Sequence, residues 1–83
     1  YKTSKTVNMD GATSATYKLT GNNGTVYASG TSAVDGTVTV TASDMTCNSG
    51  TLTVEWTISS EDEEGNISEE TVTKSYDVSF ETQ

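Results

Sequence analysis

Hydrophobic and polar residues alternate along much of the chain, and the alternation is clearest in its second half. Leu52, Val54, Trp56 and Ile58 fall on one side, with threonines and a glutamate between them. A period of two sustained over eight residues predicts a β-strand with one buried face. Because Trp56 shares the apolar side, we expect its ring in the core and not on a ligand-binding surface.

The same period predicts five further strands. They span roughly residues 3–9, 13–20, 25–29, 37–42 and 72–80. Asn22, Asn23 and Gly24 favour a turn, since Asn and Gly adopt positive φ at little cost. Lys74 falls on the apolar side of the last strand. Either that strand bulges there, or Lys74 lies at a sheet edge and its ammonium reaches water. Six or seven short strands of this kind indicate an antiparallel β-sandwich or a small barrel.

Residues 43–48 break the alternation. They predict one short helical turn, with Ser43 as its cap and Met45 closing one end of the core. No other helix is expected. No apolar run exceeds three residues, so the sequence predicts neither a membrane span nor the apolar part of a signal peptide. The chain begins with Tyr1 and not with Met, which indicates a processed chain or an excised fragment.

The composition predicts one small β-domain over residues 1–83 with a thin core. Of its 83 residues, 31% are hydrophobic, so we expect a net stability of only ~3–5 kcal/mol. The chain holds 17 Thr and 11 Ser but no Arg, His or Pro, and Thr suits the half-exposed face of a sheet. A net charge of −8 argues against nucleic acid and anionic membranes as partners. It fits a solvated surface, a divalent cation or a cationic partner.

An acidic loop is the best candidate site, because oxygen atoms are the ligands that Ca²⁺ prefers. The candidate calcium ligands are Glu61, Asp62, Glu63, Glu64 and Asn66. Their spacing does not follow the alternating Asp-x-Asp-x-Asx-Gly pattern, and six residues rarely close a coordination shell unaided. We therefore favour the interpretation of a solvated hairpin loop. No cofactor is otherwise expected.

Two other side chains were considered for binding or chemistry. If Val26 and Ala28 point inward, Tyr27 is exposed and available to contact a partner. Cys47 is the single cysteine and cannot form an internal disulfide, so we expect a small, partly buried thiol. Without histidine, no nucleophile–base pair stands out, and we do not expect an enzyme.

The stretch Gly50–Phe80 resembles the last hairpin of many bacterial and phage immunoglobulin-like (Ig-like) modules. It contains Gly-Thr-Leu-Thr-Val-Glu-Trp, then an acidic turn with Gly65-Asn66, then a closing strand through Tyr76 and Phe80. Residues 24–30 and 35–40 are similar to middle strands of those modules. The resemblance implies an all-β, Ig-like sandwich. The chain lacks the paired cysteines of antibody domains and the histidines of copper-carrying sandwiches.

The resemblance implies three functions in order of preference. The first is a non-catalytic structural or interaction module that spaces, displays or adheres, outside the cell on a bacterial or virion surface. The second is a subunit of a filament or capsid decoration, completed by strand exchange or edge pairing, for which residues 3–9 are a candidate edge. The third is a Ca²⁺-dependent carbohydrate-binding module that uses the loop 61–66.

Overall fold

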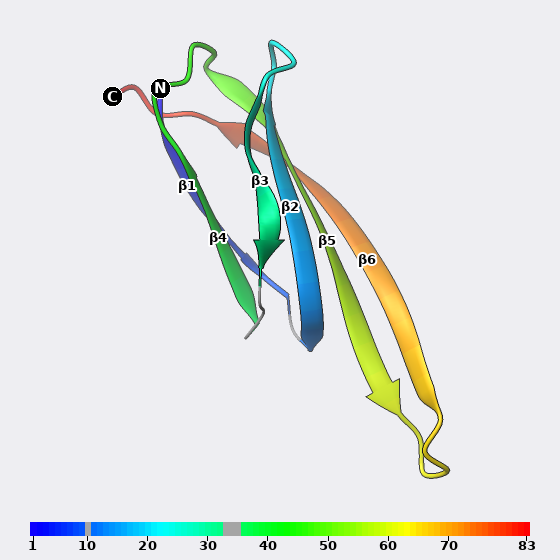
Figure 1. Ribbon diagram of the computed structural model, residues 1–83. Coiled ribbons are helices and arrows are strands. Elements are labelled where there is room, and N and C mark those ends of the chain that lie inside the picture. The colour runs from blue at the N-terminus through cyan, green and yellow to red at the C-terminus, as the bar shows by residue number, and fades with distance from the viewer. Residues whose placement is uncertain (10, 33–35) are drawn as a thin grey trace.

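The computed structural model describes residues 1–9, 11–32 and 36–83, and these residues form strands joined by turns (Figure 1). The strands are β1 (Thr3–Asn8), β2 (Ala12–Gly21), β3 (Val26–Ser32), β4 (Thr37–Ala42), β5 (Ser49–Glu61) and β6 (Ile67–Ser79). No helix occurs among the described residues. The predicted all-β class is confirmed, and each predicted strand is present with shifted ends.

The strands form two antiparallel sheets, as in a β-sandwich. One sheet has two strands in the order β1-β4, and the other has four in the order β3-β2-β5-β6. Figure 1 shows the short pair lying against one end of the longer sheet. The second layer is therefore both narrower and shorter than the first.

The core lies between the two sheets and follows the predicted alternation. The indole of Trp56 is 7% exposed, so the prediction that it belongs to the core is confirmed. Its buried apolar neighbours are Val7, Met9, Ala15, Leu19, Val38, Val40, Met45, Cys47, Leu52, Val54, Val78 and Phe80. No polar or charged residue among those described is buried. The core is thus thin and wholly apolar.

The last hairpin is longer than predicted and extends beyond the rest of the molecule. Pairing of β2 with β5 ends at Ala12 and Ile58, whereas β5 and β6 stay paired as far as Glu61 and Ile67. The molecule measures 53 × 20 × 16 Å. We call residues 59–70 the overhang, because no second layer covers them (Figure 1). Every side chain of the overhang is exposed.

The helical turn predicted over residues 43–48 does not form. Asp44 has a φ of +57°, which is incompatible with a right-handed helix. Met45 instead bonds to the start of the chain. Its N–H donates to the carbonyl oxygen of Tyr1 at 3.0 Å, and its carbonyl accepts from the Tyr1 amino group at 2.9 Å. Met45 is 3% exposed, so it does close one end of the core as expected.

Lys74 lies at a sheet edge, which was the second of its two predicted settings. The register of β5 with β6 runs without a shift from one end to the other, so β6 has no bulge there. β6 is the outermost strand of its sheet. The exposed Lys74 side chain reaches over the sheet, and its ammonium lies 5.9 Å from the centroid of the Trp56 ring.

Candidate functional site

The loop 61–66 is shaped by one carboxylate. Asp62 Oδ1 accepts hydrogen bonds from the backbone N–H groups of Glu64 at 2.9 Å and Asn66 at 2.8 Å. The side-chain amide of Asn66 donates to Asp62 Oδ2 at 3.1 Å. Gly65 adopts a φ of +82°, and its N–H donates to the Asp62 carbonyl at 3.1 Å. Both carboxylate oxygens of Asp62 therefore hold the turn itself.

These bonds also set the acidity of Asp62. Its pKa is lowered from the ordinary value, chiefly because the backbone N–H and the side-chain amide of Asn66 donate to the ionised carboxylate. The charged form is the one that the turn requires. Asp62 thus acts in this structure as the residue that closes the turn.

The five predicted calcium ligands are all exposed and do not form a cage. Across residues 1–9, 11–32 and 36–83, no three Asp, Glu or Cys side chains come together closely enough to hold a metal ion. The calcium prediction gains no support from this geometry. The overhang is nevertheless highly charged, since six of the twelve acidic residues and no lysine lie between positions 61 and 70. Ile67, within it, is 70% exposed.

Tyr27 is not the exposed residue that the alternation predicts. The pairing of β2 with β3 shifts between Leu19, opposite Ala28, and Thr20, opposite Val26. Tyr27 is the extra residue of this bulge, and a bulge turns the side chains that follow it. Val26 is therefore 46% exposed, while Tyr27 is half-buried and packs against the core.

The hydroxyl group of Tyr27 joins two turns at one end of the sandwich. It accepts from Asn23 Nδ2 at 3.1 Å and lies 3.2 Å from the hydroxyl oxygen of Thr46. The thiol of Cys47 donates to the same oxygen at 3.7 Å. Gly21 leaves room for this arrangement, because a Cβ there would lie 2.5 Å from Cys47 Sγ and 2.6 Å from Tyr27 Cε2. This cluster depends on the bulge and could not be read from the alternation.

The environment of Cys47 has opposing effects on its thiol. Burial disfavours the thiolate, but hydrogen bonds from Tyr27 and from the backbone of Asn23, Asn22 and Ser49 favour it. The pKa of Cys47 is lowered from the ordinary value as a net result. The side chain itself is buried, which restricts access to it.

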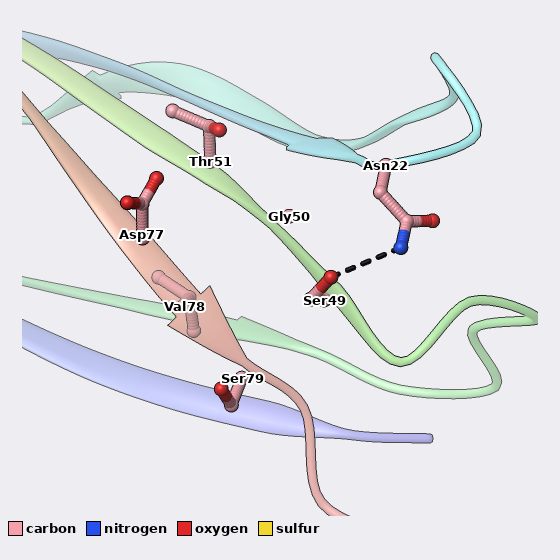
Figure 2. A pocket seen from close by; sticks show the side chains of 7 residues that line it. All are labelled: Asn22, Ser49, Gly50, Thr51, Asp77, Val78 and Ser79. Carbon is pink, nitrogen blue, oxygen red and sulfur yellow. Dashed lines mark hydrogen bonds between the residues drawn. The ribbon is translucent and has the colours of Figure 1, made fainter.

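A shallow hollow of about 280 Å³ lies on the outer face of the four-stranded sheet (Figure 2). It is lined by Asn22, Ser49, Gly50, Thr51, Asp77, Val78 and Ser79. Asn22 Nδ2 donates to Ser49 Oγ at 3.0 Å across one end of it. Amide, hydroxyl and carboxylate groups could bind a small polar molecule, but the lining holds no base to activate a nucleophile. Sequence reasoning missed this hollow, because its residues come from three separate segments.

The two chain ends lie together, at the pole opposite the overhang (Figure 1). The N–H of Lys2 donates to the carbonyl of Glu81 at 2.7 Å, and the N–H of Glu81 donates to the carbonyl of Lys2 at 2.8 Å. The Gln83 side chain accepts from the backbone N–H of Asp44 at 2.7 Å. Residues at both ends are thus fastened to the same part of the sandwich.

The described residues include no helix that is long and apolar enough to cross a bilayer. Comparison with known proteins finds no family model, no curated protein and no solved structure that matches the chain.

Proposed function

We propose that the chain is an Ig-like, non-catalytic display module, anchored at the pole where its ends meet and presenting the overhang to a partner. Its setting would be outside the cell, on a bacterial or virion surface. The resemblance of Gly50–Phe80 to such modules and the acidic, Thr-rich surface support this setting.

The strand order supports an Ig-like assignment. Ig domains have strands A, B, E and D in one sheet and C, F and G in the other, and C′ joins C in the variable type. If β1 to β6 are taken as B, C, C′, E, F and G, the observed orders β1-β4 and β3-β2-β5-β6 become B-E and C′-C-F-G. All six strands then have the neighbours that an Ig-like sandwich requires. Positions A and D have no strand among the described residues.

The position of the chain ends is the observation that carries the proposal. Lys2 and Glu81 are paired at one pole, and the overhang is at the other. A spacer lengthens a stalk when its two ends leave from opposite poles. A module whose ends leave together stands out from its attachment point instead. This geometry favours display over spacing.

The absence of a catalytic role is part of the same proposal. Catalytic groups work in enclosed sites from which water is excluded. The hollow in Figure 2 is shallow, and its single ionisable residue is Asp77. A polar ligand held there would remain in contact with solvent.

Cell attachment tests the proposal directly. Residues 1–83 are inserted into a surface loop of a bacterial outer-surface carrier, and cells are scored for attachment to a panel of immobilised proteins and glycans. In a truncated variant, Asn-Gly replaces residues 59–69 and closes the hairpin at Ile58 and Glu70, which are paired in the native register. We expect attachment to at least one surface, weakened about tenfold by the truncation, or about 1.4 kcal/mol.

The control is Lys18→Glu, a charge change at an exposed position of β2, and it should attach as the wild type does. Equal attachment by the truncated and intact modules would show that the overhang is not the presented surface.

A further inference from the structure

The strand β1 has an unpaired edge. Alternate residues of a strand direct their backbone groups to opposite sides. The N–H of Met9 donates to the carbonyl of Gly36 at 2.7 Å, so odd-numbered residues face β4. Even-numbered residues face away from β4, and of these Lys2 pairs with Glu81. Among the described residues no strand continues that pairing. The backbone groups left on the open side belong to Ser4, Thr6 and Asn8.

Beside this edge, the inner face of β6 is incompletely covered. Val78 is buried, but Val72 and Tyr76 are only half-buried although they share its side of the strand. The closest cover that β1 provides is Lys5, whose ammonium lies 5.4 Å from the centroid of the Tyr76 ring. A further strand beside β1 would lie over this part of β6. It would occupy the position that strand A takes in an Ig domain.

The uncovered face is positively charged in a chain that is otherwise acidic. Lys5 and Lys74 both extend over aromatic rings of the four-stranded sheet, and Lys2 begins the open edge. Lysines that point inward at an edge oppose indiscriminate strand pairing. They favour a strand that brings carboxylates, because opposite charges steer and select partners. The fourth lysine, Lys18, lies elsewhere, at an exposed position of β2.

The overhang of the same chain supplies such a strand. Its β6 portion and the next two residues read Ile-Ser-Glu-Glu-Thr-Val over residues 67–72. Because side chains alternate, one face carries Ile67 and Glu69, and the other carries Glu70 and Val72. Either face therefore offers one apolar group and one carboxylate. The overhang extends beyond its own second layer, so it is accessible (Figure 1). A two-stranded hairpin without further packing is only marginally stable.

We propose that the open edge of β1 accepts the overhanging end of β6 from a second copy of the chain. This inference rests on the proposed display function and names the partner of the overhang. Ser4, Thr6 and Asn8 would pair with the incoming backbone, while Lys5 and Lys74 would contact its glutamates. Donor and acceptor lie on different parts of one chain, so the contact is head-to-tail. A contact of that kind builds linear assemblies unless its rotation closes a ring.

Sedimentation velocity and light scattering on residues 1–83 test the proposal at low salt. We expect the average mass to rise with concentration toward ~1 mM, where even a millimolar contact is half-formed. It should fall again as salt screens the charges. A protein that stays monomeric at ~1 mM and low salt overturns the proposal.

Charge reversal identifies the surfaces. Lys5→Glu with Lys74→Glu makes the acceptor negative, and Glu69→Lys with Glu70→Lys makes the donor positive. Each double variant should be monomeric alone, because its donor and acceptor then carry the same sign. An equimolar mixture should assemble again, since both contacts in an alternating chain regain opposite charges. Lys18→Glu should assemble as the wild type does. Failure of the mixture to assemble overturns the assignment, and circular dichroism confirms that both variants are folded.

The outcomes separate this inference from the display function. A monomeric protein whose attachment to cells or surfaces still depends on the overhang retains the display function and loses the self-association. Attachment that is indifferent to the overhang removes the display function, whatever the oligomeric state.

Discussion

The body of the sandwich and the overhang are built from the same two strands, yet they are stabilised differently. In the body, β5 directs Leu52, Val54 and Trp56 against β1 and β4, and these side chains are buried. In the overhang, the same hairpin retains its register but has no opposing layer. Ladder hydrogen bonds and the Asp62 turn therefore hold it without apolar burial. The comparison teaches that burial depends on the second layer and not on the strand.

The largest expected difference concerns apolar side chains. Leu52→Ala removes a side chain that is 0% exposed, and we expect a loss of ~2–5 kcal/mol. Ile67→Ala in the overhang should change the free energy of unfolding by no more than ~0.5 kcal/mol. Urea denaturation followed by Trp56 fluorescence measures both. Equal losses would mean that the overhang is packed in solution.

Glycine substitutions should show a smaller difference of the same sign. A Cβ at Gly50 would overlap the carbonyl oxygen of Thr20 and lie 2.8 Å from Phe80 Cζ. Gly50→Ala should therefore cost ~1–3 kcal/mol through overpacking. Gly65 meets no close neighbour but has a φ of +82°, so Gly65→Ala should cost about 1 kcal/mol. Thermal unfolding of the two variants would contradict this order if Gly65→Ala proved the more damaging.

Tyr27→Phe tests the cluster at the body's end. Loss of the hydroxyl group removes its bonds to Asn23 and Thr46, and we expect a cost of ~0.5–1.5 kcal/mol. Burial already opposes ionisation of Cys47, and the Tyr27 bond favours it. The pKa of Cys47 should therefore rise in the variant, and thiol alkylation should require a higher pH. An unchanged alkylation profile would show that the bond does not form in solution.

Asn66→Ala should have the smallest effect, confined to the overhang. The pKa of Asp62 is lowered in the folded chain by hydrogen bonds, chiefly from Asn66. The stabilisation of the turn is thus present above the unfolded pKa and is lost as pH falls through the folded pKa. Removing the amide should raise the pKa of Asp62 toward its ordinary value. An NMR titration of the carboxyl carbon measures this, with Asn22→Ala at the opposite pole as a control that should leave it unchanged.

The sequence predicts the body better than its ends. Strict alternation around Trp56 was sufficient to predict the strand and its buried face, because a one-residue slip would expose every core side chain. The setting of Tyr27 was missed, since one extra residue at the bulge reverses the parity of Val26. The predicted turn over 43–48 failed because Met45 bonds to Tyr1, a contact between distant parts of the chain. Local propensity contains no information about such a partner.

The candidate site shows the same limit. The acidic turn and its glycine could be read from residues 61–66, but the use of Asp62 to close the turn could not. The overhang was not predicted either, because Thr and Glu alternate with apolar residues on both covered and uncovered stretches of the hairpin. Whether a second layer lies over a strand depends on the lengths of the other strands.

The pairing of Lys2 with Glu81 also has a consequence for biosynthesis. Its two members are separated by nearly the whole chain, so this closure has the largest loop entropy to overcome. A ribosome delivers Glu81 almost last. The hairpin of β2 and β3 can form on the emerging chain, whereas β1 keeps this part of its edge unpaired until synthesis is nearly complete. Exposure of that edge during translation is therefore a property of the fold, and chaperones that bind extended segments would meet it first.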